Sequence, residues 1–465
     1  MRCPYAIVSG MLLCMSCAPT PKLAVVPSLA TRQWQDAPAT NEATPRDAFW
    51  HAFGAPGLEQ LLREADAQNP ALDVARARVD RARAELGIAS ASRLPTVDAN
   101  LGFESSHARQ SASPVYTYNG ASAGLDIGYD LDLFGANRAA RRASRSRLGG
   151  SAFDADAVRL VTEAQVARSY VLLCLLDERV SLAREQLAGA RQLAAIIASR
   201  SREGAAGEAE VNAAEANVAG YADRLATFQE QQRHARVALA ILVGVEPAVF
   251  TATTLPVSAL RVPALDPGQP AELLTRRPDI RAAEARITAA RGDVDAARRA
   301  FLPSIKISGS LLGSSAGFLG PLGLTSSVGS SLLAPIFEGG RLRGQLEVAS
   351  AGQRESVALY RQSLLAALGE VSDALIAVDA SRDRAARMAA ATAGAARQLG
   401  LSKARLAEGE VGADALIDAR IDHDAAADAG LLAKADRLNA AIDLFRATGG
   451  APRASDAQTE IARSR

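Results

Sequence analysis

The sequence predicts a mixed α and β chain that is built as two similar halves. The segment 69–97 recurs at 277–305, at an offset of 208 residues and without a gap, and an internal repeat of this kind is the first feature that a fold must explain. Four stretches alternate apolar and polar residues, which is typical of strands with one apolar face. Two long runs lack proline and predict long helices.

Four strands of about ten residues are long enough to cross a bilayer when tilted, but they are too few to close a barrel. Lipid does not tolerate open strand edges. The sequence therefore predicts that several copies of the chain share one barrel, with long helices pointing away from it. Pairs of such helices must pack as coiled coils on each other and on further copies.

Residues 1–16 are predicted to be an export signal. Arg2 supplies a positive charge, and the apolar run Tyr5–Met15 is too short to span a bilayer but suits a signal core. The following Ser16–Cys17 resembles a bacterial lipoprotein cleavage site, at which Cys17 would be acylated; cleavage without acylation is the alternative. Cys174 is expected to be a small core residue rather than half of a disulfide.

Residues 17–56 are predicted to be a lipidated, extended N-terminal arm, because the segment is irregular and punctuated by proline and threonine. The first structural repeat, residues 57–248, begins with a helical pattern that Leu94–Pro95 ends, since proline cannot continue a helix. A polar loop is expected over about 105–120. The further predicted elements are strands at 97–105 and 122–134 and helices at 137–202 and 208–243.

A proline-rich connector, residues 249–270, leads to the second repeat, residues 271–447. The plan recurs there, with a helix, a strand that follows Pro303, a weaker strand at 326–336 and another long proline-free run. This run breaks at EGEVG, residues 408–412, just as the first run breaks at EGAAG. Residues 448–465 are predicted to be a disordered tail.

The polar faces of the predicted strands carry the candidate barrel-lining residues Asp98, Asp126, Asp130 and Lys306. Alternation places the carboxylates on one side of a strand, opposite side chains such as Leu125 and Ile127. A cation site would also use carboxylates. A solvated face that lines a water-filled barrel accounts for them without a metal, so no metal site is predicted.

Composition and motifs argue against catalysis and nucleic-acid binding. The formal net charge of +1 gives no basic footprint for nucleic acid. The sequence GSSAG, residues 313–317, matches the pattern of a nucleophile elbow, but that motif needs a strand, a turn and a helix, and here a loop between two strands is expected. The four histidines show neither triad nor zinc spacing. We therefore expect no enzyme and no cofactor other than the lipid on Cys17.

Several segments together resemble the TolC-like outer-membrane efflux family, in particular its lipoprotein branch that serves resistance-nodulation-division pumps. They are RRPDIRAAEARI at 276–287, AFLPSIKISG at 300–309, DLFG at 132–135, PIFEGGR at 335–341 and LIDAR at 416–420. The resemblance implies a homotrimer with four strands per protomer, which form a twelve-stranded outer-membrane β-barrel continuous with a long periplasmic α-helical coiled-coil barrel.

The resemblance also implies a function and partners. Such proteins are lipid-anchored in the outer membrane and extend into the periplasm, where they passively conduct small molecules delivered by a periplasmic membrane-fusion adaptor and an inner-membrane pump. The alternative is a trimeric coiled-coil surface protein without export function. A protein of that class would carry strict heptads and one barrel segment rather than two strand pairs.

Asp414, Asp418 and Asp422 follow the second helix break at intervals of four residues, so they share one helix face. Asp418 lies in LIDAR, which resembles the family's tip motif, where helices narrow the periplasmic end of the tunnel. The resemblance implies a cation-favouring gate, with repulsion offset by arginines such as Arg405 or Arg420. The alternative is that these aspartates only stabilise a helix N-terminus. The arginine of LIDAR stands one place earlier than in the family's LLDAQR-like motif.

Overall fold

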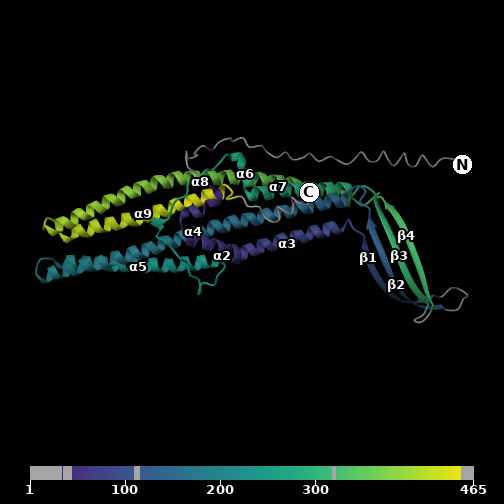
Figure 1. Ribbon diagram of the computed structural model, residues 1–465, viewed down its shortest axis with the longest axis horizontal. Helices are drawn as coiled ribbons and strands as arrows, with labels where there is room; N and C mark the ends of the chain where they lie inside the picture. The colour runs from purple at the N-terminus through teal and green to yellow at the C-terminus, as the bar shows by residue number, and fades with distance from the viewer. Residues whose placement is uncertain (1–33, 35–43, 109–115, 317–320, 452–465) are drawn as a thin grey trace.

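The computed structural model describes residue 34 and residues 44–108, 116–316 and 321–451. The protein is elongated, with a four-stranded antiparallel sheet at one end and the turns of two long helix pairs at the other (Figure 1). The predicted signal segment and Cys17 lie outside the described residues. Within these ranges, no helix combines the length and the apolar character that a membrane-crossing helix needs.

The elements follow one plan twice: a helix, two strands and two long helices. The helices are α2 (Pro56–Gln68), α3 (Pro70–Ala91), α4 (Ala136–Arg202), α5 (Glu208–Val243), α6 (Leu273–Arg276), α7 (Pro278–Arg299), α8 (Arg341–Ala407) and α9 (Ala413–Ala447). The strands are β1 (Thr96–Ala108), β2 (Tyr116–Asp130), β3 (Ser304–Ala316) and β4 (Leu322–Leu333), paired in the order β1-β2-β3-β4.

The two halves match closely in their helices. The helices α3 and α7 each have 22 residues and begin at Pro70 and Pro278, where a missing N–H costs no helical hydrogen bond. The helices α4 and α8 each have 67 residues. Both end in a turn that contains a left-handed glycine, Gly204 at φ 78° and Gly409 at φ 76°, a conformation that costs glycine little. The long helices predicted over 137–202 and 208–243 are thus α4 and α5.

The strands differ from the sequence prediction at their ends. Strand β2 begins at Tyr116, so much of the polar loop expected over 105–120 belongs to the β1–β2 hairpin, and β2 ends at Asp130 rather than Phe134. It ends there because Asp132 is left-handed, at φ 40°, and its carboxylate accepts the N–H groups of Asn137 and Arg138, both at 2.9 Å. The aspartate of DLFG therefore caps the first turn of α4 rather than facing a barrel.

Strand β4 lies four residues earlier than predicted at its start and ends at Leu333. It stops before Pro335, which lacks the N–H that a ladder needs. The GSSAG segment is not in a loop as predicted, because residues 313–316 complete β3; Gly317 lies outside the described residues. The part that is described thus offers no strand-turn-helix geometry for a nucleophile.

The main hydrophobic core lies where α4, α7, α8 and α9 meet the connector, and the arm contributes to it. The C-terminal end of the arm is not extended as predicted, because residues 46–48 and 51–53 form short 3₁₀ helices. Phe49 and Phe53 are fully buried, and the ring of Phe49 stacks on Phe445 of α9 at 4.0 Å between centroids. In the same core, burial raises the pKa of the Cys174 thiol to about 11.

The end of α9 also corrects the predicted tail, which was expected to be disordered from residue 448. Thr448 is fully buried, and its hydroxyl donates to the carbonyl of Leu444 at 2.8 Å. Gly450, at φ 66°, packs against Leu160 so closely that a Cβ would overlap that side chain. The ordered chain therefore continues through residue 451, and residues 452–465 lie outside the described part.

Candidate functional site

The gate predicted from the sequence falls at the helix ends farthest from the sheet (Figure 1). Here α4 turns into α5 and α8 turns into α9. The turn before α5 is closed by Glu210, whose carboxylate accepts the N–H of Gly207 at 3.2 Å, a capping interaction at the helix N-terminus. The corresponding turn before α9 leads directly to the predicted aspartates.

The structure places the three aspartates on α9. Asp418 and Asp422 are exposed, and neither takes part in an ion pair found among the described residues. The side chain of Asp414 is outside the described part. Arg405, predicted as a neutralising partner, lies 4.0 Å from Glu410 instead. The exposed carboxylates of Asp418 and Asp422 therefore have no arginine partner within the described part of the chain.

The sequence analysis missed a buried carboxylate only two residues farther along α9. Asp424 is 4% exposed and accepts a hydrogen bond from the Tyr221 hydroxyl of α5 at 2.8 Å. His423 Nδ1 and Arg420 Nε lie 3.2 and 3.8 Å from its oxygens. Burial and the Asp424 charge raise the pKa of Tyr221, so the phenol stays protonated and donates the bond.

Arg420 belongs to this cluster and not to the predicted gate aspartates. Its guanidinium lies over Gly189 of α4, where a Cβ would overlap it. Arg420 and Asp424 are four residues apart and share a face that Asp418 and Asp422 do not share. This spacing was the available signal in the sequence, although the partners Tyr221 and Gly189 could not be read from it. The cluster ties α9 to both helices of the first pair.

Ion pairs continue this connection between α4 and α9 toward the sheet. Arg179 donates two hydrogen bonds to Asp428, at 2.6 and 2.8 Å, while its guanidinium lies 4.0 Å from the Phe228 ring centroid. Arg168 lies 3.1 Å from Asp443, whose pKa is raised by burial in spite of this arginine. The two helix pairs are therefore joined by charge-assisted contacts along the bundle.

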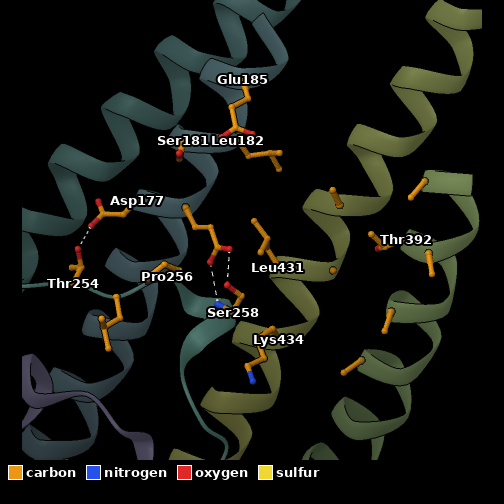
Figure 2. Close-up of a pocket in the computed structure, with 18 residues that line it drawn as sticks. Asp177, Ser181, Leu182, Glu185, Thr254, Pro256, Ser258, Thr392, Leu431 and Lys434 are labelled. Atoms are coloured by element: carbon orange, nitrogen blue, oxygen red, sulfur yellow. Dashed lines mark hydrogen bonds between the residues drawn. The ribbon is translucent and has the colours of Figure 1, made fainter. Parts of the chain in front are cut away.

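A groove of about 990 Å³ opens between α4, the connector and the pair α8 and α9 (Figure 2). Two carboxylates of α4 that line this groove accept hydrogen bonds from the connector. Asp177 accepts a hydrogen bond from Thr254 at 2.5 Å, and Glu178 accepts bonds from the N–H and hydroxyl of Ser258 at 3.1 and 2.8 Å. These contacts fasten the connector to α4, and on the opposite wall burial lowers the pKa of Lys434.

The strand register brings the predicted barrel-lining residues onto one face of the sheet. Asp98 lies opposite Asp126 on the neighbouring strand, and Asp130 lies opposite Lys306. The side chain of Asn100 donates a hydrogen bond to Asp126, which moderates the repulsion between the two opposed carboxylates. Val97 and Ile127 form a pair on the other face and are 63% and 48% exposed.

Both edge strands, β1 and β4, lack a partner on their outer side within the described chain. An edge with free backbone groups and a broad exposed apolar face is unstable in water. Further strands would pair with the free backbone groups of the edges, and an apolar environment such as lipid would cover the apolar face. The sheet thus has the geometry of one segment of a larger closed sheet.

The chain is similar to known outer-membrane proteins over both halves. A model of the family described as outer membrane efflux protein matches residues 61–245 and 270–450. The pyoverdine export outer membrane protein OpmQ of Pseudomonas aeruginosa is 32% identical over 465 residues, 96% of either chain. The probable outer membrane lipoprotein SilC of Salmonella typhimurium is 29% identical over 343 residues, which are 73% of this chain and 73% of its own.

A solved structure gives the same fold. The open state of the MtrE outer membrane channel of Neisseria gonorrhoeae matches with a TM-score of 0.81 and 27% sequence identity. The match covers 93% of this chain and 97% of that one. The sheet, the long helix pairs and their arrangement are therefore shared with a channel.

Proposed function

The chain belongs to the outer membrane efflux protein family, and from this premise we propose that the exposed aspartates at the start of α9 form the periplasmic gate of a passive duct. The protein is the outer-membrane channel of an efflux system. It is a homotrimer that works with a periplasmic adaptor and an inner-membrane resistance-nodulation-division pump. The predicted family, assembly and location are thus confirmed.

One observation supports a duct most directly: the four-stranded sheet with open edges stands at the end of helices about 100 Å long. Three copies of the sheet close into one barrel, and the helices continue the same wall away from the membrane. The register supports a polar interior lined by Asp98, Asp126, Asp130 and Lys306, with Ile127 toward lipid. Transport through such a duct needs no chemistry of its own, so we propose no catalytic role.

The gate proposal rests on the contrast between two sets of acidic residues on α9. Asp424 is buried and bonded to Tyr221, which holds the helix pairs together. Asp418 and Asp422 are exposed near the turn, so a trimer brings three copies of each toward the end of the tunnel. Their mutual repulsion in a narrow, water-filled opening favours cations and resists close approach of the helices.

Removal of both exposed carboxylates tests the gate. Asp418→Ala combined with Asp422→Ala should raise the single-channel conductance of purified trimers in planar bilayers and reduce their cation selectivity. Glu230→Ala, which removes an exposed carboxylate from the middle of α5, should leave both quantities near the wild-type values. An unchanged conductance and selectivity in a well-assembled double variant would show that these aspartates do not line the opening.

We also propose that Cys17 carries the lipid anchor. The support is the short apolar run that ends in Ser16–Cys17 and the similarity to a relative described as a probable lipoprotein. Mass spectrometry of the mature N-terminus should find an acylated Cys17. An unmodified terminus at another residue would contradict the proposal, and Cys17→Ala should weaken anchoring without preventing insertion of the barrel.

A further inference from the structure

The two long helices α4 and α8 are equivalent in the internal repeat but have different neighbours in one protomer. Figure 1 shows the order α8, α9, α4 and α5 across the bundle. The helix α4 packs on α3 and α5 of its own repeat and also on α7 and α9 of the other repeat. By equivalence α8 should pack on α3 and α5 as well, yet no extensive contact joins α8 to either of them within the described chain.

Burial at equivalent positions follows this difference. The helices α4 and α8 align without a gap at an offset of 205 residues, since Ala136 corresponds to Arg341 and Arg202 to Ala407. Ala143 of α4 is fully buried against Gly292 of α7, whereas its equivalent on α8, Val348, is 74% exposed. Apolar area that is covered in one repeat is thus open in the other.

The same asymmetry separates the partners α9 and α5, which align at the same offset. Ile442 of α9 is fully buried, while its equivalent on α5, Val237, is 44% exposed. Exposed apolar side chains continue along the two faces. They are Leu365 and Ile376 on α8 and Ile241 on α5. Both faces therefore present the apolar area that a helix contact of the α4–α9 kind would bury.

Charge provides an independent observation. One of the ion pairs that join the two repeats is Arg179 with Asp428. Moving both positions by the offset gives Arg384 on α8 and Asp223 on α5, so both residue types recur. In the protomer Asp223 is exposed and belongs to α5, the helix at the opposite edge of the bundle from α8 (Figure 1). The side chain of Arg384 is 62% exposed and donates a hydrogen bond to Asp436 at 3.3 Å, a surface contact that a second carboxylate could share or replace.

We propose that Arg384 of one protomer forms an ion pair with Asp223 of the partner subunit, and that the exposed face of α8 packs on α5 and α3 of that second copy. Around the trimer, three such pairs alternate with the three Arg179–Asp428 pairs. The α8–α9 pair is then joined to a helix pair on each side, by Arg179–Asp428 within its own chain and by Arg384–Asp223 between chains. The proposal rests on the trimeric assembly and is independent of the gate.

Cross-linking between differently tagged chains tests the contact. One chain carries Arg384→Cys and the other Asp223→Cys, and co-expressed trimers are treated with a bismaleimide of about 8 Å span, since cysteines more than about 7 Å apart at Cα cannot form a disulfide. A species of twice the chain mass that carries both tags is expected. Arg382→Cys replaces Arg384→Cys as the control, because it is exposed on a different face of α8 and should not react with Asp223→Cys.

A second control secures a negative result. Arg179→Cys with Asp428→Cys in one chain should form a cross-link within that chain, so the product keeps the size of a monomer. Peptide mass spectrometry detects the linked pair of peptides. If this control reacts and native electrophoresis shows an intact trimer, absence of the two-tag species overturns the proposed contact. Monomers in native electrophoresis of the unmodified protein would overturn the trimeric premise itself.

Charge exchange gives a readout that needs no cross-linker. Asp223→Arg should lower the temperature at which trimers dissociate in detergent, and adding Arg384→Asp should restore it. The matched comparison pairs Arg384→Asp with Asp436→Arg. If that exchange restores the dissociation temperature and the exchange with Asp223 does not, Arg384 serves its own protomer and the proposal is wrong.

Discussion

At the residue scale, Arg277 shows why a short sequence motif can carry the fold. Its guanidinium is 8% exposed and bonds both oxygens of Asp279, at 3.0 and 2.7 Å, the carboxylate of Glu370 at 2.9 Å and the carbonyl of Ala447 at 2.8 Å. These contacts join the start of α7 to α8 and to the end of α9. Burial lowers the pKa of Arg277, but the two carboxylates outweigh this effect and raise it.

Arg277→Ala should lower the free energy of unfolding by about 3 kcal/mol, because the carbonyl of Ala447 and the carboxylates of Asp279 and Glu370 lose the guanidinium that joins them. Thermal unfolding of purified protein, followed by circular dichroism, measures the change. Arg276→Ala is the matched control, since that side chain is 34% exposed and pairs with Glu272 on the surface. Equal shifts for the two variants would refute the central role of Arg277.

At the element scale, the orientation of the strands is set by their register, and a one-residue slip would exchange the two faces. Ile127→Arg should destabilise the barrel by about 2–4 kcal/mol if the residue lies near the middle of the bilayer, whereas Ile127→Leu should be tolerated. Cysteine labelling with a water-soluble reagent gives the direction. We expect a cysteine at Asp126 to react and one at Ile127 to be protected, and the opposite pattern would mean that the faces are reversed.

The sequence was sufficient to predict which helices and strands the chain forms, but not which side chains of neighbouring elements touch. Proline and glycine mark the helix ends, so the bounds of α4 and α5 could be placed within a residue or two. The end of β2 could not, because the alternation continues through Asp132 while the backbone turns left-handed to cap α4. Local periodicity contains no information about such a tertiary cap.

The contacts of the gate region show the same limit. Tyr221 and Asp424 are 203 residues apart, and their meeting depends on how two coiled helix pairs cross. The spacing of Asp414, Asp418 and Asp422 predicted a common face, which holds for the two whose side chains are described. It could not show that Arg420 turns away from them toward Gly189.

At the scale of the whole molecule, assembly and location follow from the family and from the open sheet edges. Membrane fractionation should place the protein in the outer membrane, and unheated samples should migrate as trimers in detergent gels that heating converts to monomers. A soluble enzyme or a coiled-coil surface protein would not show this combination. A fully soluble protein, or one whose mobility does not depend on heating, would contradict the shared barrel.

The constant offset between α4 and α8 has a consequence for how the chain can change in length. Each residue of an α-helix turns the chain by about 100°, so one residue inserted between Arg147 and Arg179 would carry every later contact of α4 to another side. Arg147 binds Asp293 near the sheet, and Arg179 binds Asp428 farther from it. After such an insertion the helix could keep only one of these two ion pairs. Insertions and deletions in these helices should therefore be tolerated only when they add or remove whole coiled-coil repeats, which keep each side chain on its face, and when both halves of the chain change together. The molecule can alter its surface residue by residue, but its reach across the periplasm only in matched steps.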